Sequence, residues 1–330
     1  MRLDVIRSAK SALSGTVQEC PQGDISRRIV EPCRLLPKEP FKRRLARRVS
    51  RIALALQAPR VRRLAAVPIT VRYNLIGLED RFGSDASLAV LLRLVRAEPV
   101  KRVLIPGCFL GGEDVQFWLR RGVERLDGID VYSLEERWRS IVPELRKQYR
   151  ADVNFRQGAV ERIPFPDCSF DLLATDAVVE HVRNLDAMAS ETARVLRRGG
   201  WAWHCFGPLY YSFGADHCIA AYGDSAGYDH LLLSDAEYQK RIWDQAFFDR
   251  TPNPNLPFWA RQNQFSFAVA AEYVEHFQRH FEIVHVVLKL SAKALEYRQL
   301  QPGSWARLVQ AGVAEQDLLI KSMCLVLRKK

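Results

Sequence analysis

Two short runs of residues could bind a ligand that contains a nucleoside. The first, residues 105–112, reads Ile-Pro-Gly-Cys-Phe-Leu-Gly-Gly and follows a short apolar run. Glycines in such a turn let the backbone approach a ligand closely at the carboxyl end of a strand. The second, Gly128-Ile129-Asp130, comes about 20 residues later, where an acidic side chain can accept hydrogen bonds from both hydroxyls of a ribose. These runs fit a nicotinamide dinucleotide and S-adenosylmethionine equally well, and Asp130 could also cap a helix.

Three further segments narrow the choice. Residues 158–171 read Gly-Ala-Val-Glu-Arg-Ile-Pro-Phe-Pro-Asp-Cys-Ser-Phe-Asp, residues 176–182 read Asp-Ala-Val-Val-Glu-His-Val, and residues 194–201 read Arg-Val-Leu-Arg-Arg-Gly-Gly-Trp. As a set, these segments are similar to those of small-molecule methyltransferases of the methyltransferase-11/12 type. NAD dehydrogenases do not carry this combination. Residues from about 100 to 206 therefore resemble a class I S-adenosylmethionine-dependent methyltransferase with a degenerate glycine motif.

The resemblance implies that S-adenosylmethionine lies across eight positions at the ends of the strands. They are Pro106, Gly107, Gly111, Asp130, Val131, Ala159, Val160 and Asp176. Three residues depart from the family's pattern. Ile105 stands at an acidic position, Phe109 at the central glycine, and Ala159 at the aspartate that usually meets the adenine amino group. The departures leave two interpretations, a modified cofactor pocket and a binding-deficient pseudo-enzyme.

The methyl acceptor is expected to bind in an insertion. Residues 207–280 separate two predicted strands, which is far longer than an ordinary connection. This stretch is rich in Tyr, Phe and Trp, and such a segment over the ligand edge of a sheet indicates a lid with an apolar acceptor pocket. The same aromatic residues could instead form only the core of a small cap.

Histidine is the expected base if the acceptor is a hydroxyl, which must lose a proton, whereas an amine only needs to be neutral. The catalytic candidates are His217, His181 and His230, with His217 first, and each could instead be structural. Asp216 and Asp229 directly precede two of them, and a carboxylate can orient an imidazole, although adjacent side chains point in different directions. These pairs could also hold a divalent metal, but no metal site is predicted.

Apolar runs and helical patterns alternate along the chain, which is typical of a parallel sheet with crossover helices. Seven strands are predicted, at residues 103–106, 126–131, 153–155, 170–175, 201–206, 283–290 and 323–327. Residues 68–98 are expected to be a helical lead-in, and Gly199-Gly200 to end a helix as its C-cap. The sequence thus predicts an α/β fold with a doubly wound, mostly parallel seven-stranded sheet of the Rossmann-like methyltransferase kind. A cap insertion follows the fifth strand, and a basic helical arm precedes the sheet.

The charge of the chain is concentrated at one end. Residues 1–66 hold 16 Lys and Arg against 5 Asp and Glu, whereas the other 264 residues hold 33 of each. Residues 41–57 repeat apolar residues at helical spacing with arginines between them, which predicts a basic amphipathic helix. The helix either docks on the domain or, through residues 41–63, adsorbs to an anionic membrane surface or a polyanion. The expected division is an arm at residues 1–66 and a methyltransferase-like domain at 67–330.

These observations favour an enzyme that methylates a small-molecule or glycan- or lipid-linked acceptor at oxygen. A non-catalytic methyltransferase-fold protein, docked on a membrane or partner by its arm, is the first alternative. An RNA methyltransferase is the second, but the neutral body disfavours nucleic acid as a partner. No apolar run is long enough to span a bilayer, and the seven cysteines form no CxxC pair. A cytoplasmic protein, with the arm allowing peripheral membrane contact, is therefore expected.

Overall fold

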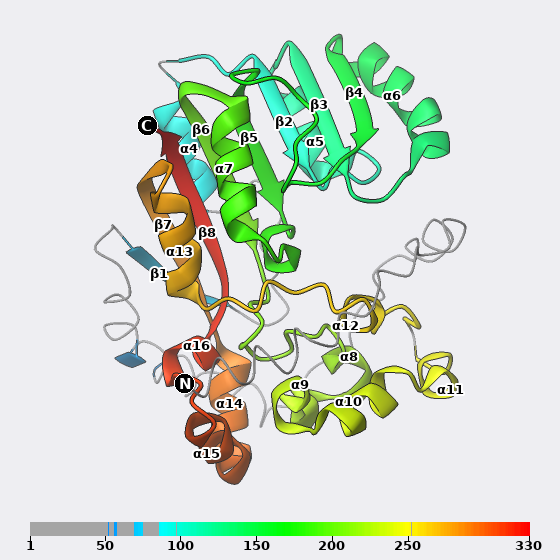
Figure 1. Ribbon diagram of the computed structural model, residues 1–330, viewed down its shortest axis with the longest axis vertical. Helices are drawn as coiled ribbons and strands as arrows, with labels where there is room; N and C mark the ends of the chain where they lie inside the picture. The colour runs from blue at the N-terminus through cyan, green and yellow to red at the C-terminus, as the bar shows by residue number, and fades with distance from the viewer. Residues whose placement is uncertain (1–51, 53–55, 58–68, 75–85, 97, 252) are drawn as a thin grey trace.

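The computed structural model describes residues 52, 56–57, 69–74, 86–96, 98–251 and 253–330. Within these residues, eight strands form one sheet in the order β1-β7-β8-β6-β5-β2-β3-β4 (Figure 1). The strands are β1 Ile69–Asn74, β2 Arg102–Pro106, β3 Arg125–Asp130, β4 Asp152–Gln157, β5 Phe170–Asp176, β6 Leu196–Phe206, β7 Phe281–Ser291 and β8 Ile320–Lys329. Strand β8 is antiparallel to both neighbours, and every other pair is parallel. The predicted mostly parallel α/β sheet is confirmed.

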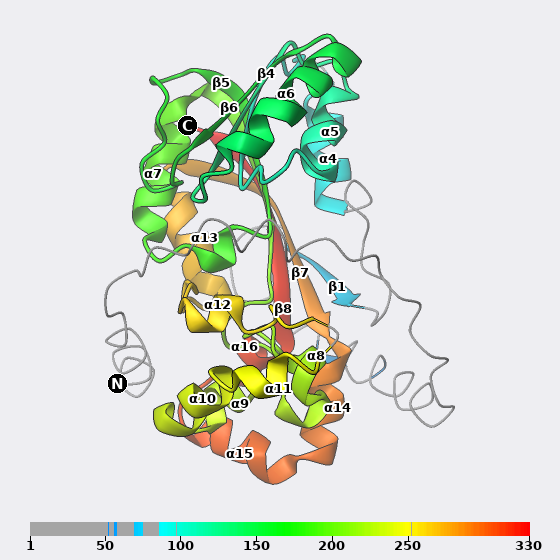
Figure 2. The same ribbon diagram turned by 90° about the vertical axis from the view of Figure 1, so that its right-hand side faces the viewer.

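Helices cover both faces of this sheet, as Figure 2 shows from the side. One face carries α4 Ala86–Leu94, α5 Glu113–Leu119 and α6 Glu135–Tyr149, and the other carries α7 Leu185–Val195 and α13 Ala270–Gln278. Each face has its own apolar core. The chain order reverses beside β2, which lies between β3 and β5. In doubly wound sheets, ligands bind at the carboxyl ends of the strands at such a reversal.

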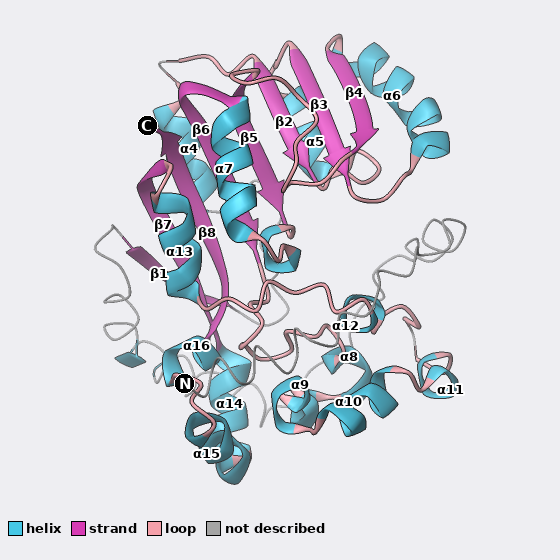
Figure 3. Ribbon diagram, in the orientation of Figure 1, coloured by secondary structure: helices cyan, strands magenta, loops and turns pink. Residues whose placement is uncertain are grey.

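Two insertions lie together at one end of the sheet, the first beyond the carboxyl ends of strands β2 to β5 and the second beyond the end of β7 (Figure 3). The first contains α8 Ile219–Tyr222, η3 Asp224–Ala226, α9 Asp229–Leu232, α10 Asp235–Ile242, α11 Gln245–Phe248 and α12 Phe258–Arg261. The second contains α14 Ala292–Leu300, α15 Pro302–Gln310 and α16 Glu315–Leu319. We call these insertions, residues 207–269 and 292–319, the cap. The buried Tyr228 joins them, because its hydroxyl donates to the Leu318 carbonyl (2.7 Å) and its ring contacts Tyr297.

The expected helical lead-in at residues 68–98 is wrong in its first part. Residues 69–74 (Ile-Thr-Val-Arg-Tyr-Asn) form strand β1, which pairs in parallel with β7, and a helix is described at residues 86–94. β-Branched and aromatic residues favour a strand over a helix, and β7 offers an edge for pairing. The sheet therefore has an eighth strand that the sequence did not predict.

The predicted C-cap at Gly199-Gly200 is also wrong. Helix α7 ends at Val195, and both glycines lie inside strand β6. Gly199 has a φ of +71°, and the register of β6 against β5 shifts nearby. A β-bulge needs a residue that adopts this left-handed conformation cheaply, and glycine does so at bulges as well as at helix ends.

The predicted basic arm, residues 1–66, lies outside the described residues except for Ile52, Leu56 and Gln57. Its membrane or polyanion contact therefore stays a prediction. Within the described part of the chain, no helix is both long enough and apolar enough to cross a membrane.

Candidate functional site

The loop after β2 is shaped by two glycines with left-handed backbone. Gly107 has a φ of +75° and Gly111 a φ of +71°, both rarely adopted by other residues. A Cβ on Gly107 would lie 2.4 Å from the Val178 side chain, which follows β5. The backbone of this loop therefore packs directly against the end of β5. The sequence predicted both glycines for close approach, and the structure places them at the carboxyl edge next to the buried Pro106.

Phe109 and Ile105, two residues that depart from the family's pattern, both pack into the core on the α5 side. Phe109 takes a φ of +39°, in the left-handed region that a glycine would adopt more cheaply. Its side chain packs against the apolar cluster that contains the buried Ile105. Its carbonyl accepts a hydrogen bond from the Trp138 indole (2.6 Å). The loop thus keeps a glycine-like path although a phenylalanine stands in it.

Asp130 ends β3 beside this loop and has a 7% exposed side chain. Its carboxylate accepts hydrogen bonds from the Phe109 N–H (3.1 Å) and the Tyr132 N–H (3.0 Å). Its carbonyl accepts from the Gly158 N–H (2.8 Å), which brings the following residues, Ala159 and Val160, to the same edge. The predicted ribose, loop and adenine positions are therefore adjacent. Val131, next in sequence, is 50% exposed and presents an apolar side chain there.

Two of the three predicted catalytic histidines lie together. The His181 and His217 rings are 5.6 Å apart and stacked, and Trp259 of α12 stacks on His181 at 4.3 Å. His181 follows β5 in the 3-10 helix η2 Val179–His181, and its Nδ1 bonds to the Gln264 carbonyl (2.7 Å). The predicted Asp176 ends β5 five residues earlier. The imidazole pair thus lies between the end of β5 and the cap.

The His217 imidazole has a strongly lowered pKa and is therefore neutral. Burial, assisted by His181 and Lys321, lowers the pKa of His217 to about 3. Its Nε2 is buried and, among the described residues, has no hydrogen-bond partner. A neutral imidazole with a partnerless nitrogen can accept a hydrogen bond from a hydroxyl group. Burial also lowers the pKa of His181, opposed by its bond to Gln264.

His230 lies elsewhere, in the aromatic core of the cap. It is fully buried, and its Nε2 bonds to the Tyr210 carbonyl (2.8 Å). Neither neighbouring aspartate orients a histidine. Asp216 accepts from the Cys218 N–H and the Tyr238 hydroxyl, and Asp229 pairs with Arg241. Within the described residues, no group of three or more His, Cys, Asp or Glu is arranged to hold a metal.

The cap closes over this edge through residues that the sequence analysis did not single out. The Tyr132 hydroxyl bonds to the Gln264 side chain (3.1 Å), and the Tyr132 ring contacts Phe258 and Trp259. Gln264 therefore links the end of β3 to His181 at the end of β5. Tyr132 could have been found from the sequence, because it stands two residues after Asp130, the aspartate at the ligand edge. Nothing in the sequence placed Gln264 beside it.

The comparisons with known proteins agree with this arrangement. Residues 104–204 match the family model described as a methyltransferase domain. A probable S-adenosylmethionine-dependent methyltransferase from Mycolicibacterium smegmatis is 30% identical over 138 residues, which cover 41% of this chain. The chain spans about half (50%) of that relative's length. Together these matches confirm the resemblance of residues 100–206 to a class I methyltransferase and the predicted cofactor, S-adenosylmethionine.

Solved structures of methyltransferases are also similar to this chain. A putative methyltransferase from Bacillus halodurans is 15% identical with a TM-score of 0.42, covering 74% of this chain and 99% of that one. A putative sarcosine dimethylglycine methyltransferase from Galdieria sulphuraria is 15% identical with a TM-score of 0.44, covering 74% and 84%.

The residues of the methyltransferase domain fit a cationic nucleoside cofactor. Burial raises the pKa of Asp114 of α5, reinforced by Asp176 and Asp130, and burial also raises the pKa of Asp130. Among the described residues, neither Asp114 nor Asp130 forms an ion pair with Lys or Arg. Buried carboxylates without a cationic partner favour a ligand that brings positive charge. S-Adenosylmethionine carries a sulfonium, an ammonium group and a ribose diol, so the donor set suits it. Ala159, in contrast, offers adenine backbone groups only.

We expect Asp114 to make the affinity for S-adenosylmethionine pH-dependent. Burial raises the pKa of Asp114 to about 6, assisted by Asp176 and Asp130. A bound cation favours the ionised carboxylate, so binding releases a proton below that pKa. We expect the Kd for S-adenosylmethionine to tighten up to about tenfold as pH rises from 5 to 7 and then to level off. Isothermal titration calorimetry across this range measures it, and Asp114→Asn should flatten the curve. Equal slopes for both proteins would contradict the assignment.

Glu180 connects η2 with the end of β6 and with the cap. Its side chain is 2% exposed, and Oε1 accepts from the Gly207 N–H (2.9 Å) at the end of β6. Its carbonyl accepts from the Ser266 N–H (2.8 Å) of the cap. Burial raises the pKa of Glu180 to about 8, opposed by the Gly207 bond and reinforced by Asp176. Glu180 is therefore a neutral acid at pH 7 that positions the turn entering the cap.

Replacing Glu180 with glutamine should stabilise the protein in alkaline solution. The unfolded carboxyl ionises near 4.5 and the folded one near 8, so the free energy of unfolding falls as pH rises through this window. Glutamine keeps an acceptor for Gly207 and cannot ionise. At pH 8.5 we expect Glu180→Gln to raise the free energy of unfolding by about 2–4 kcal/mol, and at pH 5 to change it little. Thermal unfolding from pH 5 to 9 tests this, and parallel curves would show that Glu180 does not titrate in the window.

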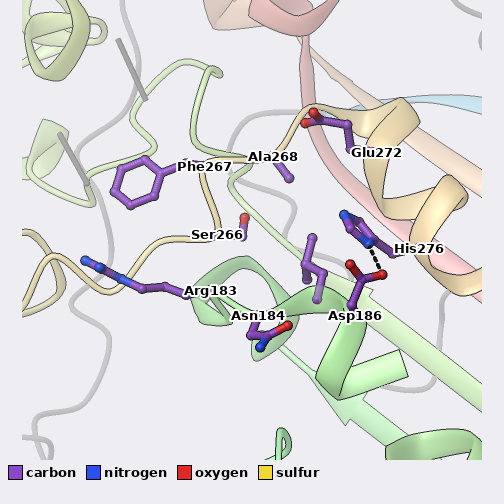
Figure 4. A pocket seen from close by; sticks show the side chains of 9 residues that line it. Arg183, Asn184, Asp186, Ser266, Phe267, Ala268, Glu272 and His276 are labelled. Atoms are coloured by element: carbon purple, nitrogen blue, oxygen red, sulfur yellow. Dashed lines mark hydrogen bonds and ion pairs between the residues drawn. The ribbon is translucent and has the colours of Figure 1, made fainter. Parts of the chain in front are cut away.

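A cavity of about 300 Å³ lies beside the cap segment that covers His181. Figure 4 shows Arg183, Asn184 and Asp186 at the start of α7 on one side and Glu272 and His276 of α13 on the other. Its polar groups bond to each other or to nearby backbone, as in the His276–Asp186 pair (2.7 Å). The sequence analysis missed this cavity, because residues about 90 positions apart form it.

Proposed function

We propose that this chain transfers a methyl group from S-adenosylmethionine to a hydroxyl of a small-molecule or glycan- or lipid-linked acceptor. When bound, the cofactor supplies a methyl group on a positively charged sulfur. Asp130 would hold the ribose hydroxyls, and Ala159 and Val160 would lie against adenine. The carboxylates Asp114 and Asp176 would attract the cationic end.

The observation that carries the oxygen target is the buried Nε2 of His217, which has no hydrogen-bond partner in the part of the chain that the structure describes. A hydroxyl acceptor must lose a proton, and that proton becomes strongly acidic as the oxygen gains the methyl group. Even an imidazole with a pKa near 3 can then accept it. An amine acceptor would need no such group. The cap would align the acceptor and exclude water, which is the main contribution an enzyme makes to a displacement reaction.

The test is a turnover assay with matched acceptors. The full chain is incubated with S-adenosylmethionine and pairs of phenols and anilines, or alcohols and amines, of the same skeleton, and S-adenosylhomocysteine formation is measured. The proposal predicts turnover with hydroxyl members and much less with amines. Turnover with the amines alone would overturn the oxygen target.

A non-catalytic binding protein is the second candidate, and the residues Phe109, Ile105 and Ala159 favour it. Such a protein would bind the cofactor weakly or not at all. In this second candidate function, the basic arm contacts an anionic membrane, and the protein is located at the membrane periphery.

A further inference from the structure

Two cysteines, to which no role in methyl transfer is assigned, face each other near the end of β6. In the antiparallel pairing of β6 with β8, Cys205 stands directly opposite Cys324. Their sulfur atoms are 3.1 Å apart. Directly opposed residues of antiparallel strands have Cα atoms about 4.5 or 5.5 Å apart, and both values suit a disulfide. Closing the bond would require the sulfur atoms to approach by only about 1 Å.

We propose that Cys205 and Cys324 are an oxidisable dithiol that hydrogen peroxide converts to a disulfide. The sulfur of Cys205, the more exposed of the two, attacks peroxide and breaks the O–O bond, which gives a sulfenic acid and one water. The sulfur of Cys324 then attacks the Cys205 sulfur, forms the S–S bond and releases the second water. Two thiols thereby lose two hydrogens, and the peroxide is reduced to two molecules of water.

The surroundings set the rate of this step. The bond to Cys324 and burial raise the pKa of the Cys205 thiol, whereas the Lys289 ammonium lowers it. The thiolate is the reactive form, so oxidation should be slow at neutral pH and faster in alkali. Once Cys205 is oxidised, the contact distance makes the second step intramolecular and fast.

The pair lies against the proposed cofactor edge, although the inference does not depend on methyl transfer. Cys205 pairs in register with Asp176 of β5, and its carbonyl accepts from the Ala177 N–H (2.8 Å). A cross-link between β6 and β8 would therefore join the strand that adjoins Asp176 to the antiparallel strand of the sheet.

The test maps the link in the full chain. The protein is treated with hydrogen peroxide, free thiols are blocked with iodoacetamide, and the chain is digested with trypsin without reduction. We expect peptide 322–328, which holds Cys324, to appear linked to peptide 199–240, with two hydrogens fewer than the sum. Reduction should separate them. Raising the pH should speed the appearance of the link.

Peptide 199–240 also contains the buried Cys218, so Cys218→Ser is the matched control and should retain the link. Cys205→Ser and Cys324→Ser should lose it. If the other two variants fail to fold, peptide mapping of the Cys218→Ser protein still tests the proposal. Two results with folded, peroxide-treated protein would overturn the proposal. In the first, Cys324 is found only in its alkylated form. In the second, Cys205 is oxidised to sulfinic acid and no link forms.

Discussion

Replacing Asp130 with alanine is expected to weaken the binding of S-adenosylmethionine and S-adenosylhomocysteine by about 100-fold or more. The buried carboxylate is the group proposed to accept hydrogen bonds from both ribose hydroxyls, and hydrogen bonds to a charged acceptor contribute about 1.5–3 kcal/mol each. The variant also frees the Phe109 and Tyr132 N–H groups that shape the pocket. Isothermal titration calorimetry with both ligands measures the change.

Asp171→Ala is the matched control for this variant. Asp171 also accepts from two backbone N–H groups, those of Lys101 and Arg102, and pairs with Arg197, but it lies at the start of β5, at the opposite edge of the sheet. The Asp171→Ala variant should lose stability, because two backbone N–H groups lose their acceptor there too, but it should keep its affinity for the cofactor. If Asp171→Ala and Asp130→Ala weaken binding equally, Asp130 acts only by supporting the fold.

Replacing His217 with alanine is expected to slow turnover of a hydroxyl acceptor by about 100-fold or more while leaving the cofactor Kd nearly unchanged. General-base groups contribute about 10²–10⁴ in rate, and the proposal assigns that task to the buried Nε2 of His217, which no described residue hydrogen-bonds. Initial rates of S-adenosylhomocysteine formation, measured on a phenol that the unchanged chain methylates, give the comparison.

Imidazole rescue separates a chemical role of His217 from a structural one. Alanine leaves a gap where the ring stacked against His181, and free imidazole can occupy such a gap and accept the proton. Partial recovery of the rate with added imidazole is expected for His217→Ala. An unchanged rate in the untreated variant would remove His217 from the reaction. A loss of cofactor affinity equal to the loss of rate would indicate a structural role instead.

The sequence was most informative where side chains and turns act locally. The alternation of apolar runs and helical patterns located the strands that end at Pro106, Asp130 and Asp176, because strand and helix periods differ over a few residues. Strand β1 was missed because it precedes the recognisable segment and its partner, β7, lies more than 200 residues later. Gly199 was misassigned because a bulge and a helix C-cap need the same backbone freedom.

The candidate site was predictable along each strand end but not across them. The positions of Gly107 and Asp130 followed from their spacing, and the structure brings them to one edge. The pairing of His181 with His217 depends on how the cap folds back, which spacing does not encode. The bond from Tyr132 to Gln264 spans 132 residues, and the insertion at residues 292–319 that completes the cap left no motif.

Calorimetric titration of the full chain with S-adenosylhomocysteine tests the central claim most directly. The product lacks the reactive methyl group, so binding is measured without turnover. If the carboxyl edge formed by Gly107, Asp130 and Val160 is a cofactor site, the unchanged chain should bind one equivalent with a Kd in the micromolar range, and Asp130→Ala should bind at least about 100-fold more weakly. Absence of binding at millimolar ligand by the folded, unchanged chain would contradict the account.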